Sequence, residues 1–388
     1  MLFWAAKVGQ KHGIFILTRH FQKLSTFPLD KTNECARASR FAGQILLPPM
    51  LQSTLQDQFF EIILKRFPRR ADAVDELCHL LNLAKDPIYR RLRGDTPLLP
   101  QELGLLSQHF NISLDALVIG QSDRVVVDFN AFSHKIASFS DYLGAMNDDF
   151  EQIHKMPNAH LYYASAELPV FTYSLFPELI AFKLYGWGRT TWNLEWLRDR
   201  KFSFDLITQP VIRESQNMLQ QYLALPSTEL WTAQIMDNTL AQIEYHLYAG
   251  GFRDPQDSLV LIDRLQEWAS HMKALTIAGC KFNIGEKPEH GRGQFQLFYN
   301  EMVYANITAL ITSDVGRMAY TAYCTPNFLK STDTRLCDYT QNWFEIITGK
   351  STALTHAADK NRDWFFREIT QKVERRKQRI LLHIEENQ

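Results

Sequence analysis

Residues 85–93 concentrate side chains that can contact nucleic acid. The segment reads KDPIYRRLR and holds four cations against one acid. Arginine can bind guanine through two hydrogen bonds, aspartate can accept a hydrogen bond from cytosine, and lysine or tyrosine can contact phosphate or base. If the segment is a helix with one exposed face, it predicts DNA contacts by Lys85, Asp86, Tyr89, Arg90 and Arg93.

The positive charge is local to this segment. Residues 50–120 as a whole contain eight Lys and Arg against nine Asp and Glu. Non-specific DNA affinity depends strongly on overall positive charge, so this balance argues against tight non-specific binding. A second interpretation therefore stays open, in which the cations of 85–93 are only the solvated face of a helix.

Apolar residues at spacings of three and four predict that short helices position this segment. Asp86 followed by Pro87 is a helix-start signal, because aspartate can cap a helix and proline fits its first turn. The pattern predicts a compact all-α module whose helices lie at about 55–67, 70–81, 87–92, 99–110 and 114–117.

The stretch 80–94, LLNLAKDPIYRRLRG, resembles the helix-turn-helix of the lambda-repressor-like family, and the likeness extends over about residues 53–119. Asn82 stands where that family usually has Gly, and asparagine tolerates the left-handed conformation such a turn needs. Ala84 stands where a capping Ser is usual, so we expect capping to shift to Asp86. Arg91 and Leu92 replace a frequent Trp-Glu pair.

The resemblance implies a recognition helix that enters the major groove of double-stranded DNA, which gives the five side chains of 85–93 their role. Arg69 and Arg70, at the start of the preceding helix, could contact phosphates or could be ordinary surface residues. A single module buries roughly 600–1,000 Å² on DNA, so a homodimer on two half-sites is expected.

Beyond the helical module the sequence predicts a larger α+β part, so the chain as a whole is expected to be mixed α and β. We expect a linker strand at 125–129 and a linker helix at about 132–155. Further strands are predicted at 161–164 and 169–173, and an antiparallel meander at 295–299, 307–312 and 317–324. Helices are predicted at 177–185, 210–224, 228–248 and 256–276, and two more close the chain.

The helix predicted at 256–276 carries an apolar stripe formed by Leu261, Leu265, Trp268, Met272 and Leu275. This stripe could serve as core within the chain or as a dimer contact, and core is favoured. Phrases such as LYYA at 161–164, FPEL at 176–179 and FYNE at 298–301 are similar to a group of bacterial one-component regulators whose C-terminal domain has no assigned chemistry.

The larger part carries no complete catalytic or cofactor-binding motif. His271 and Lys273 begin like half of a phospholipase D signature, but Ala278 stands where the aspartate belongs. Gly291-x-Gly293 lacks the third glycine of a dinucleotide loop, and His290 beside it fits an exposed loop. A pocket for a small-molecule effector remains possible, lined by some of Tyr162, Tyr163, Phe171, Tyr173, Phe176, Tyr185 and Trp187.

Composition limits the class of protein. The chain has 388 residues, 45% hydrophobic, with 42 Lys and Arg against 43 Asp and Glu, as expected of a globular protein of two or three domains. Its five cysteines form no C-x-x-C pair, so neither a disulfide framework nor a zinc site is predicted, and a cytoplasmic location is expected. No window approaches the ~18 apolar residues of a membrane span.

These observations divide the chain into four segments. Residues 1–49 are a poorly ordered tail or follow a mis-assigned start codon, 50–120 are the helix-turn-helix DNA-binding domain, 121–157 are a linker strand and helix, and 158–388 are a sensing or oligomerisation domain. The function expected is that of a transcriptional regulator. The alternative is an enzyme of unknown reaction whose helix-turn-helix-like segment only targets it to DNA or to protein partners.

Overall fold

The computed structural model describes residues 54–110, 112, 114, 117, 125–130, 136–301, 307–355 and 359–387. The segment 1–49 lies outside the described residues, and so do residues 115 and 116 of the helix expected at 114–117. Throughout the described ranges, no helix is both long enough and apolar enough to cross a lipid bilayer.

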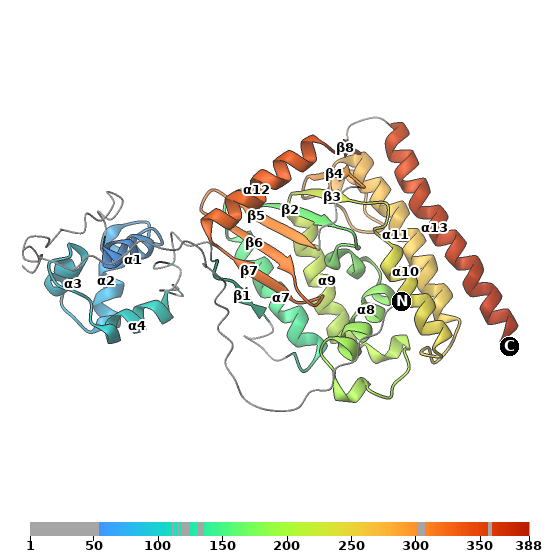
Figure 1. Cartoon of the computed structure of the whole chain (residues 1–388), viewed down its shortest axis with the longest axis horizontal. Coiled ribbons are helices and arrows are strands. Elements are labelled where there is room, and N and C mark those ends of the chain that lie inside the picture. The colour runs from blue at the N-terminus through green and yellow to red at the C-terminus, as the bar shows by residue number, and fades with distance from the viewer. Residues whose placement is uncertain are drawn as a thin grey trace, which may run out of the picture.

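The N-terminal described residues form four helices, α1 (Leu55–Leu64), α2 (Arg70–Leu81), α3 (Lys85–Leu92) and α4 (Pro100–His109), which we call the helical part (Figure 1). They share a core of their own, made by Phe59, Phe60, Ile63, Val74, Leu77, Ile88, Leu106, Phe110 and Ile112. Four predicted helices are therefore confirmed, each within a few residues.

The remainder, residues 128–387, is built on one mixed sheet and is called the sheet part. Within the described residues the sheet has eight strands in the order β1-β7-β6-β5-β2-β3-β4-β8. The bounds are β1 (Asp128–Phe129), β2 (His160–Ser165), β3 (Ser227–Trp231), β4 (Phe295–Tyr299), β5 (Thr308–Thr312), β6 (Arg317–Ala322), β7 (Phe328–Ser331) and β8 (Thr352–Ala353).

The helices of the sheet part are α7 (Phe139–His154), α8 (Pro177–Thr190), α9 (Gln209–Ala224), α10 (Asp237–Tyr248), α11 (Asp257–Ala278), α12 (Thr334–Gly349) and α13 (Asp359–Glu386). Short 3₁₀ turns are η1 (Val170–Leu175), η2 (Glu195–Leu197), η3 (Phe204–Leu206) and η4 (Pro288–His290). The chain is thus mixed α and β, as the sequence predicts.

Two strands in the middle of the sheet differ from the prediction. Residues 228–248 are not one helix, because 227–231 form β3, whose five residues are all buried, and α10 begins only at Asp237. β4 is not part of an antiparallel meander, since it pairs parallel with β3. The β5–β6 hairpin is antiparallel as predicted. A strand buried on both faces lacks alternation, so periodicity cannot distinguish it from a buried helix.

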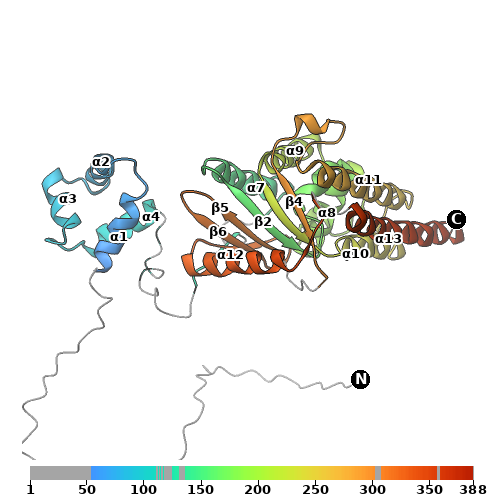
Figure 2. The ribbon, with the colours of Figure 1, turned by 90° about the horizontal axis from the view of Figure 1, so that it is seen from above.

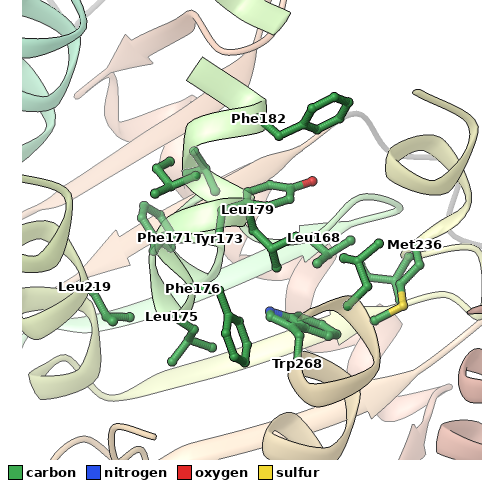
Figure 3. Close-up of a cluster of buried hydrophobic side chains, with 14 of the residues drawn as sticks. Leu168, Phe171, Tyr173, Leu175, Phe176, Leu179, Phe182, Leu219, Met236 and Trp268 are labelled. Atoms are coloured by element: carbon green, nitrogen blue, oxygen red, sulfur yellow. The ribbon is translucent and has the colours of Figure 1, made fainter. Parts of the chain in front are cut away.

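The strand predicted at 169–173 is wrong, because this segment is the 3₁₀ turn η1. All six residues of η1 are buried, and the Thr172 hydroxyl donates to the Pro169 carbonyl at 2.7 Å. Figure 3 shows Phe171, Tyr173 and Leu175 projecting in different directions into the core around Trp268. A short apolar run that is enclosed on every side gives no periodic signal for either structure.

The two faces of the sheet carry unequal layers. α12 packs on one face, where Ala164, Leu230 and Leu310 cluster with Cys337 and Phe344. Figure 2 shows α7 and α9 on the opposite face. The larger core lies on that face. Residues paired in register, such as Tyr163, Glu229 and Leu297, project together from that opposite face.

Residues expected to link the two parts belong to the sheet part instead. β1 pairs antiparallel with β7, with Asp128 opposite Lys330. α7 begins at Phe139, where Ser138 caps it, and its Tyr142, Leu143 and Phe150 join the large core. The amphipathic pattern of α7 is therefore that of a core helix rather than of a connector.

The apolar stripe of α11 is core. All five residues, Leu261, Leu265, Trp268, Met272 and Leu275, are at most 1% exposed. α11 packs against α13, α10 and α8, which cover the stripe within the chain. The stripe therefore cannot be the surface of a dimer contact.

Candidate nucleic-acid interface

A tight turn joins α2 to α3 and fixes their angle. Asn82 has φ +51°, in the left-handed region, as expected for asparagine in place of glycine. Its N–H bonds to the His79 carbonyl at 3.4 Å, and the Leu83 N–H bonds to the Cys78 carbonyl at 3.1 Å. These two bonds satisfy carbonyls at the end of α2, in the Schellman arrangement.

α3 starts earlier than predicted. It begins at Lys85 after Ala84, which offers no side-chain cap, so the expected shift of capping to Asp86 is wrong. The Asp86 carboxylate instead forms an ion pair with Arg90, one turn further along the helix, with Oδ2 and Nε 3.0 Å apart. Pro87 has no N–H, so the uncapped helix start has one fewer backbone donor to satisfy.

One side of α3 is anchored to the helical part. Ile88 is 1% exposed in the core. Arg91 makes a two-pronged pair with Glu102 of α4, with Nε–Oε2 at 3.0 Å and Nη2–Oε1 at 2.8 Å. Gln56 of α1 donates to the Arg91 carbonyl at 2.7 Å. These contacts hold α3 at a defined angle to α1 and α4.

The five residues predicted to contact DNA all lie on the exposed side of α3 or at its end. The side chains of Lys85, Arg90 and Arg93 are 64%, 59% and 55% exposed. Tyr89 is 37% exposed, and Asp86 is also at the surface. The structure therefore brings the predicted residues together on one short, outward-facing element.

Lys85, Arg90 and Arg93, the exposed cations of α3 and its C-terminal end, each form an ion pair with a carboxylate. Lys85 Nζ lies 2.6 Å from Asp75 Oδ1, Arg90 pairs with Asp86, and Arg93 Nε lies 2.8 Å from Asp95 Oδ2. The pKa of Lys85 is raised, chiefly by its hydrogen bond to Asp75. Exposed pairs of this kind are worth only about 0–1 kcal/mol, so a phosphate can replace the carboxylate at little cost.

Basic residues outside α3 differ in how they are held. Arg69 contacts Asp72 through both Nε and Nη2, while Arg70 is exposed. In the basic run of α13, Arg376 and Arg379 both pair with Glu244, and Lys377 pairs with Asp263 at 2.6 Å. That run therefore fastens α13 to α10 and α11.

Sequence reasoning missed the residues that orient α3. Arg91, Glu102 and Gln56 are far apart in the sequence, and nothing in the local pattern marks them as partners. The one available signal was that Arg91 stands where the resemblance predicts a tryptophan. A cation at a half-buried position favours a carboxylate partner, and Glu102 supplies it.

The sheet part contains a buried group of charged and polar side chains. Glu229 of β3 and Lys281 are each 0% exposed. Tyr222 stands between them: its hydroxyl donates to Glu229 Oε1 at 2.6 Å, and its carbonyl accepts from Lys281 Nζ at 3.1 Å. Burial raises the pKa of Glu229 and lowers the pKa of Lys281.

Hydrogen bonds compensate both buried groups. Glu229 also accepts from the Ser227 hydroxyl at 2.9 Å and from Trp231 Nε1 at 3.1 Å, and Lys281 also donates to the Leu225 carbonyl at 2.6 Å. Lys281 Nζ lies 3.8 Å from the centre of the Tyr222 ring. An arrangement so completely hydrogen-bonded is suited to holding β3 and α9 in register.

A second buried lysine, Lys183 of α8, is 3% exposed and donates to Gln242 Oε1 at 2.9 Å. Its Nζ lies 5.0 Å from the ring centre of Tyr173 and 5.5 Å from that of Trp187. Burial lowers the pKa of Lys183 to about 8. Cation–π contacts and one hydrogen bond therefore stand in for a carboxylate partner.

The residues of the weak catalytic motifs noted in the sequence have separate structural partners. His271 Nε2 lies 3.0 Å from the Phe282 carbonyl, whereas Lys273 pairs with Asp363 at 2.7 Å. Gly293 fits against the Leu225 backbone, where an added Cβ would come within 2.6 Å of the carbonyl oxygen. In the described part of the chain no group of three His, Cys, Asp or Glu could hold a metal ion.

A pocket of about 450 Å³ opens between α7 and the face of the sheet opposite α12; we call it the α7 pocket. Of the aromatic residues predicted as pocket candidates, Tyr163 and Phe171 line it. Tyr162 projects from the other face, towards Phe344, and Tyr173, Phe176, Tyr185 and Trp187 belong to the large core.

Comparison with known proteins gives no relative. No family model matches the chain, and no curated protein or solved structure is significantly similar to it.

Proposed function

We propose that this chain is a sequence-specific DNA-binding transcriptional regulator with a lambda-repressor-like helix-turn-helix in its helical part. The observation that carries the proposal is the division of α3 into two sides. Ile88 and Arg91 anchor one side, while Lys85, Tyr89 and Arg90 are exposed on the other. A helix placed this way presents donors without disturbing its own core.

The dimensions of α3 suit a major groove. A helix with its side chains is about 10–12 Å in diameter, which fits a major groove about 12 Å wide, and the eight residues of α3 extend about 12 Å along their axis. In the proposed complex Arg90 and Arg93 leave Asp86 and Asp95 and turn to bases or phosphates. The Arg91–Glu102 pair stays in place and sets the angle at which α3 enters the groove.

The sheet part would sense a ligand, hold two copies of the chain together, or do both. One helical part binds one half-site, and two half-sites lie about 34 Å apart, so a dimer gives useful affinity. The α11 stripe is excluded as the contact because it is core. Light scattering of the full chain at micromolar concentration should report a dimer, and a monomer both free and on DNA would contradict this part of the proposal.

The main experiment selects genomic DNA fragments bound by the full chain and then compares variants on the selected site. Arg90→Ala and Arg93→Ala should each weaken binding by about 1–3 kcal/mol, or reduce the salt dependence if the lost contact is to phosphate. Neither should change stability, since both side chains are exposed.

Arg253→Ala is the matched control. Arg253 pairs with Asp205 at 2.8 Å and its side chain is 63% exposed, so in exposure and ion-pair distance it resembles Arg93, but it lies in the sheet part. It should leave affinity and salt dependence unchanged. Wild-type binding by both α3 variants, or equal loss in the control, would remove α3 as the reader of DNA.

A further inference from the structure

The α7 pocket has the size of a small-molecule site. Its volume of about 450 Å³ falls within the roughly 300–1,000 Å³ typical of such sites. α7 forms one wall, and strands β1, β7, β6, β5 and β2 form the other. The pocket therefore lies between α7 and the antiparallel half of the sheet.

Aromatic rings line the inner end of the pocket. Phe150 meets Phe171 edge to face at 5.2 Å, and Phe171 meets Tyr163 at 5.8 Å. Phe150, Tyr163 and Phe171 are buried, whereas Tyr320 and Phe328 are only half-buried. The face of an aromatic ring is electron-rich, so this end favours an apolar group or an organic cation.

Two tyrosines that line the pocket have buried hydroxyls without a hydrogen-bond partner of normal geometry among the described residues. Tyr142 of α7 is 1% exposed, and its hydroxyl has no hydrogen-bond partner among the described residues. The Tyr163 hydroxyl is likewise buried and makes no hydrogen bond of normal geometry, although the Ser165 hydroxyl lies near it on the same strand. Buried hydroxyls are rarely left unpartnered, and a bound polar group could satisfy them.

The charged groups of the pocket are mostly acidic. Asp128 of β1 and Asp148 and Asp149 of α7 line it together with one cation, Lys330 of β7. Lys330 Nζ pairs with Asp149 Oδ1 at 2.8 Å. Asp128 and Asp148 are exposed and pair with no described cation. Two carboxylates thus remain uncompensated beside an aromatic interior.

We propose that the α7 pocket binds a small organic cation, an amine or quaternary ammonium with an aromatic or aliphatic body. The body fills the aromatic end, and the cationic nitrogen lies towards Asp128 and Asp148. This inference names a ligand class for the sensing role of the proposed function. It rests on that function only for the statement that ligand binding regulates the protein.

The test is isothermal titration calorimetry of the full chain, without DNA, with three probes that share one ring. The probes are phenethylammonium, 3-phenylpropionate and 2-phenylethanol, which are cationic, anionic and neutral. The cation should bind saturably and at least about tenfold more tightly than either of the others. Equal binding of all three, preference for the anion, or no saturable binding of the cation would overturn the proposal.

Two acid-to-amide variants of α7 locate the site. Asp148→Asn should weaken binding of phenethylammonium about two- to fivefold, the range expected of one exposed charge. Glu151→Gln makes the same change in charge at an exposed residue of α7 that does not line the pocket, and should have no effect. Equal effects of the two variants would mean that the cation binds elsewhere.

A filling variant gives the larger effect. Ala145 lines the pocket from α7, and Ala145→Trp should abolish binding of phenethylammonium. If that variant fails to fold, Asp148→Lys replaces it, because an exposed lysine there repels a cation without filling the core; binding should fall about tenfold or more. Wild-type affinity in the folded variant would contradict the assignment.

The assay separates this inference from the proposed function. If the chain binds the cation but no DNA, the assignment of the α7 pocket stands and the proposed DNA-binding function is contradicted. If the chain selects DNA but binds no cation, the proposed function stands and the assignment of the pocket is contradicted.

Discussion

In the helical part Lys85, Arg90 and Arg93 each hold a carboxylate at the surface, whereas in the sheet part Lys281 and Glu229 lie wholly buried among hydrogen bonds. The surface pairs cost little to break, because water can replace either partner. The buried groups cannot be separated so easily, since an uncompensated charge would remain in the core.

The difference indicates which charges are available for binding. A cation that must leave its partner to contact DNA has to be exposed and weakly held, as those of α3 are. Lys281 donates to two carbonyls and stacks on Tyr222, so it is committed to the fold. The contrast supports the proposal that α3 binds DNA and indicates that the buried group stabilises the fold, and substitutions can test each side of it.

The largest expected effect is that of replacing Lys281. Lys281→Met should lower the free energy of unfolding by about 3–5 kcal/mol, because the buried Tyr222 and Leu225 carbonyls would lose their donor and Glu229 would lose the nearby positive charge. Urea denaturation followed by circular dichroism measures it. Adding Glu229→Gln should recover part of the loss, since a neutral amide needs no counter-charge.

Lys273→Met serves as the control for this substitution. Lys273 pairs with Asp363 at the surface, with side-chain exposures of 38% and 56%, so its loss should cost no more than about 1 kcal/mol. If Lys281→Met and Lys273→Met lowered the free energy of unfolding equally, the proposed difference between surface and buried charges would be contradicted.

Acid should destabilise the sheet part through two half-buried histidines. Burial lowers the pKa of His160 and of His246 to about 4, with smaller contributions from Lys281 and Arg189 respectively. Between pH 6.5 and 4 the unfolded chain binds protons that the folded chain does not. The free energy of unfolding should therefore fall as pH falls through that window, by about 1–2 kcal/mol for each histidine after allowance for partial solvent access.

Urea midpoints between pH 7 and 4 check this expectation. The double variant His160→Gln, His246→Gln should show a shallower loss of stability over the window, whereas the exposed His290→Gln should follow the wild type. An unchanged profile in the double variant would show that other groups cause the acid sensitivity.

Two buried tyrosines offer a smaller, matched comparison within the sheet part. The Tyr173 hydroxyl bonds to Thr239 Oγ1 at 2.7 Å, whereas that of Tyr142 has no partner among the described residues. Tyr173→Phe should cost about 1–2 kcal/mol of stability, and Tyr142→Phe should cost nothing or stabilise slightly. Thermal unfolding of both variants, without ligand, measures the difference, and the reverse order would be inconsistent with the unpaired hydroxyl.

The smallest effect concerns the acids that hold the α3 cations. Asp95→Asn releases Arg93 and should raise DNA affinity by about 0.2–1 kcal/mol, with stability unchanged within about 0.5 kcal/mol. Asp205→Asn, which releases Arg253 in the sheet part, is the control and should not alter affinity. Weaker binding by Asp95→Asn would mean that Asp95 positions Arg93 rather than competes for it.

The same contrast explains what sequence could predict. Helices α1 to α4 have one apolar stripe each and polar ends, so spacing located them and also located the exposed residues of α3. Segments such as β3 and η1 are buried on all sides. Their sequences therefore show no alternation of apolar and polar residues from which a strand or a helix could be predicted. The Arg91–Glu102 pair and the α7 pocket depend on residues that only the tertiary fold brings together.

The pairing of β1 with β7 has a consequence for synthesis of the protein. The Ser331 hydroxyl donates to the Val126 carbonyl, 205 residues earlier in the chain. At about 5–20 residues per second, a ribosome needs roughly 10–40 s to make the second partner after the first. The core of the helical part is complete in sequence by Ile112, whereas the α7 pocket must wait for Phe328 and Lys330. A nascent chain thus completes its proposed DNA-reading half well before the half proposed to sense a ligand can exist.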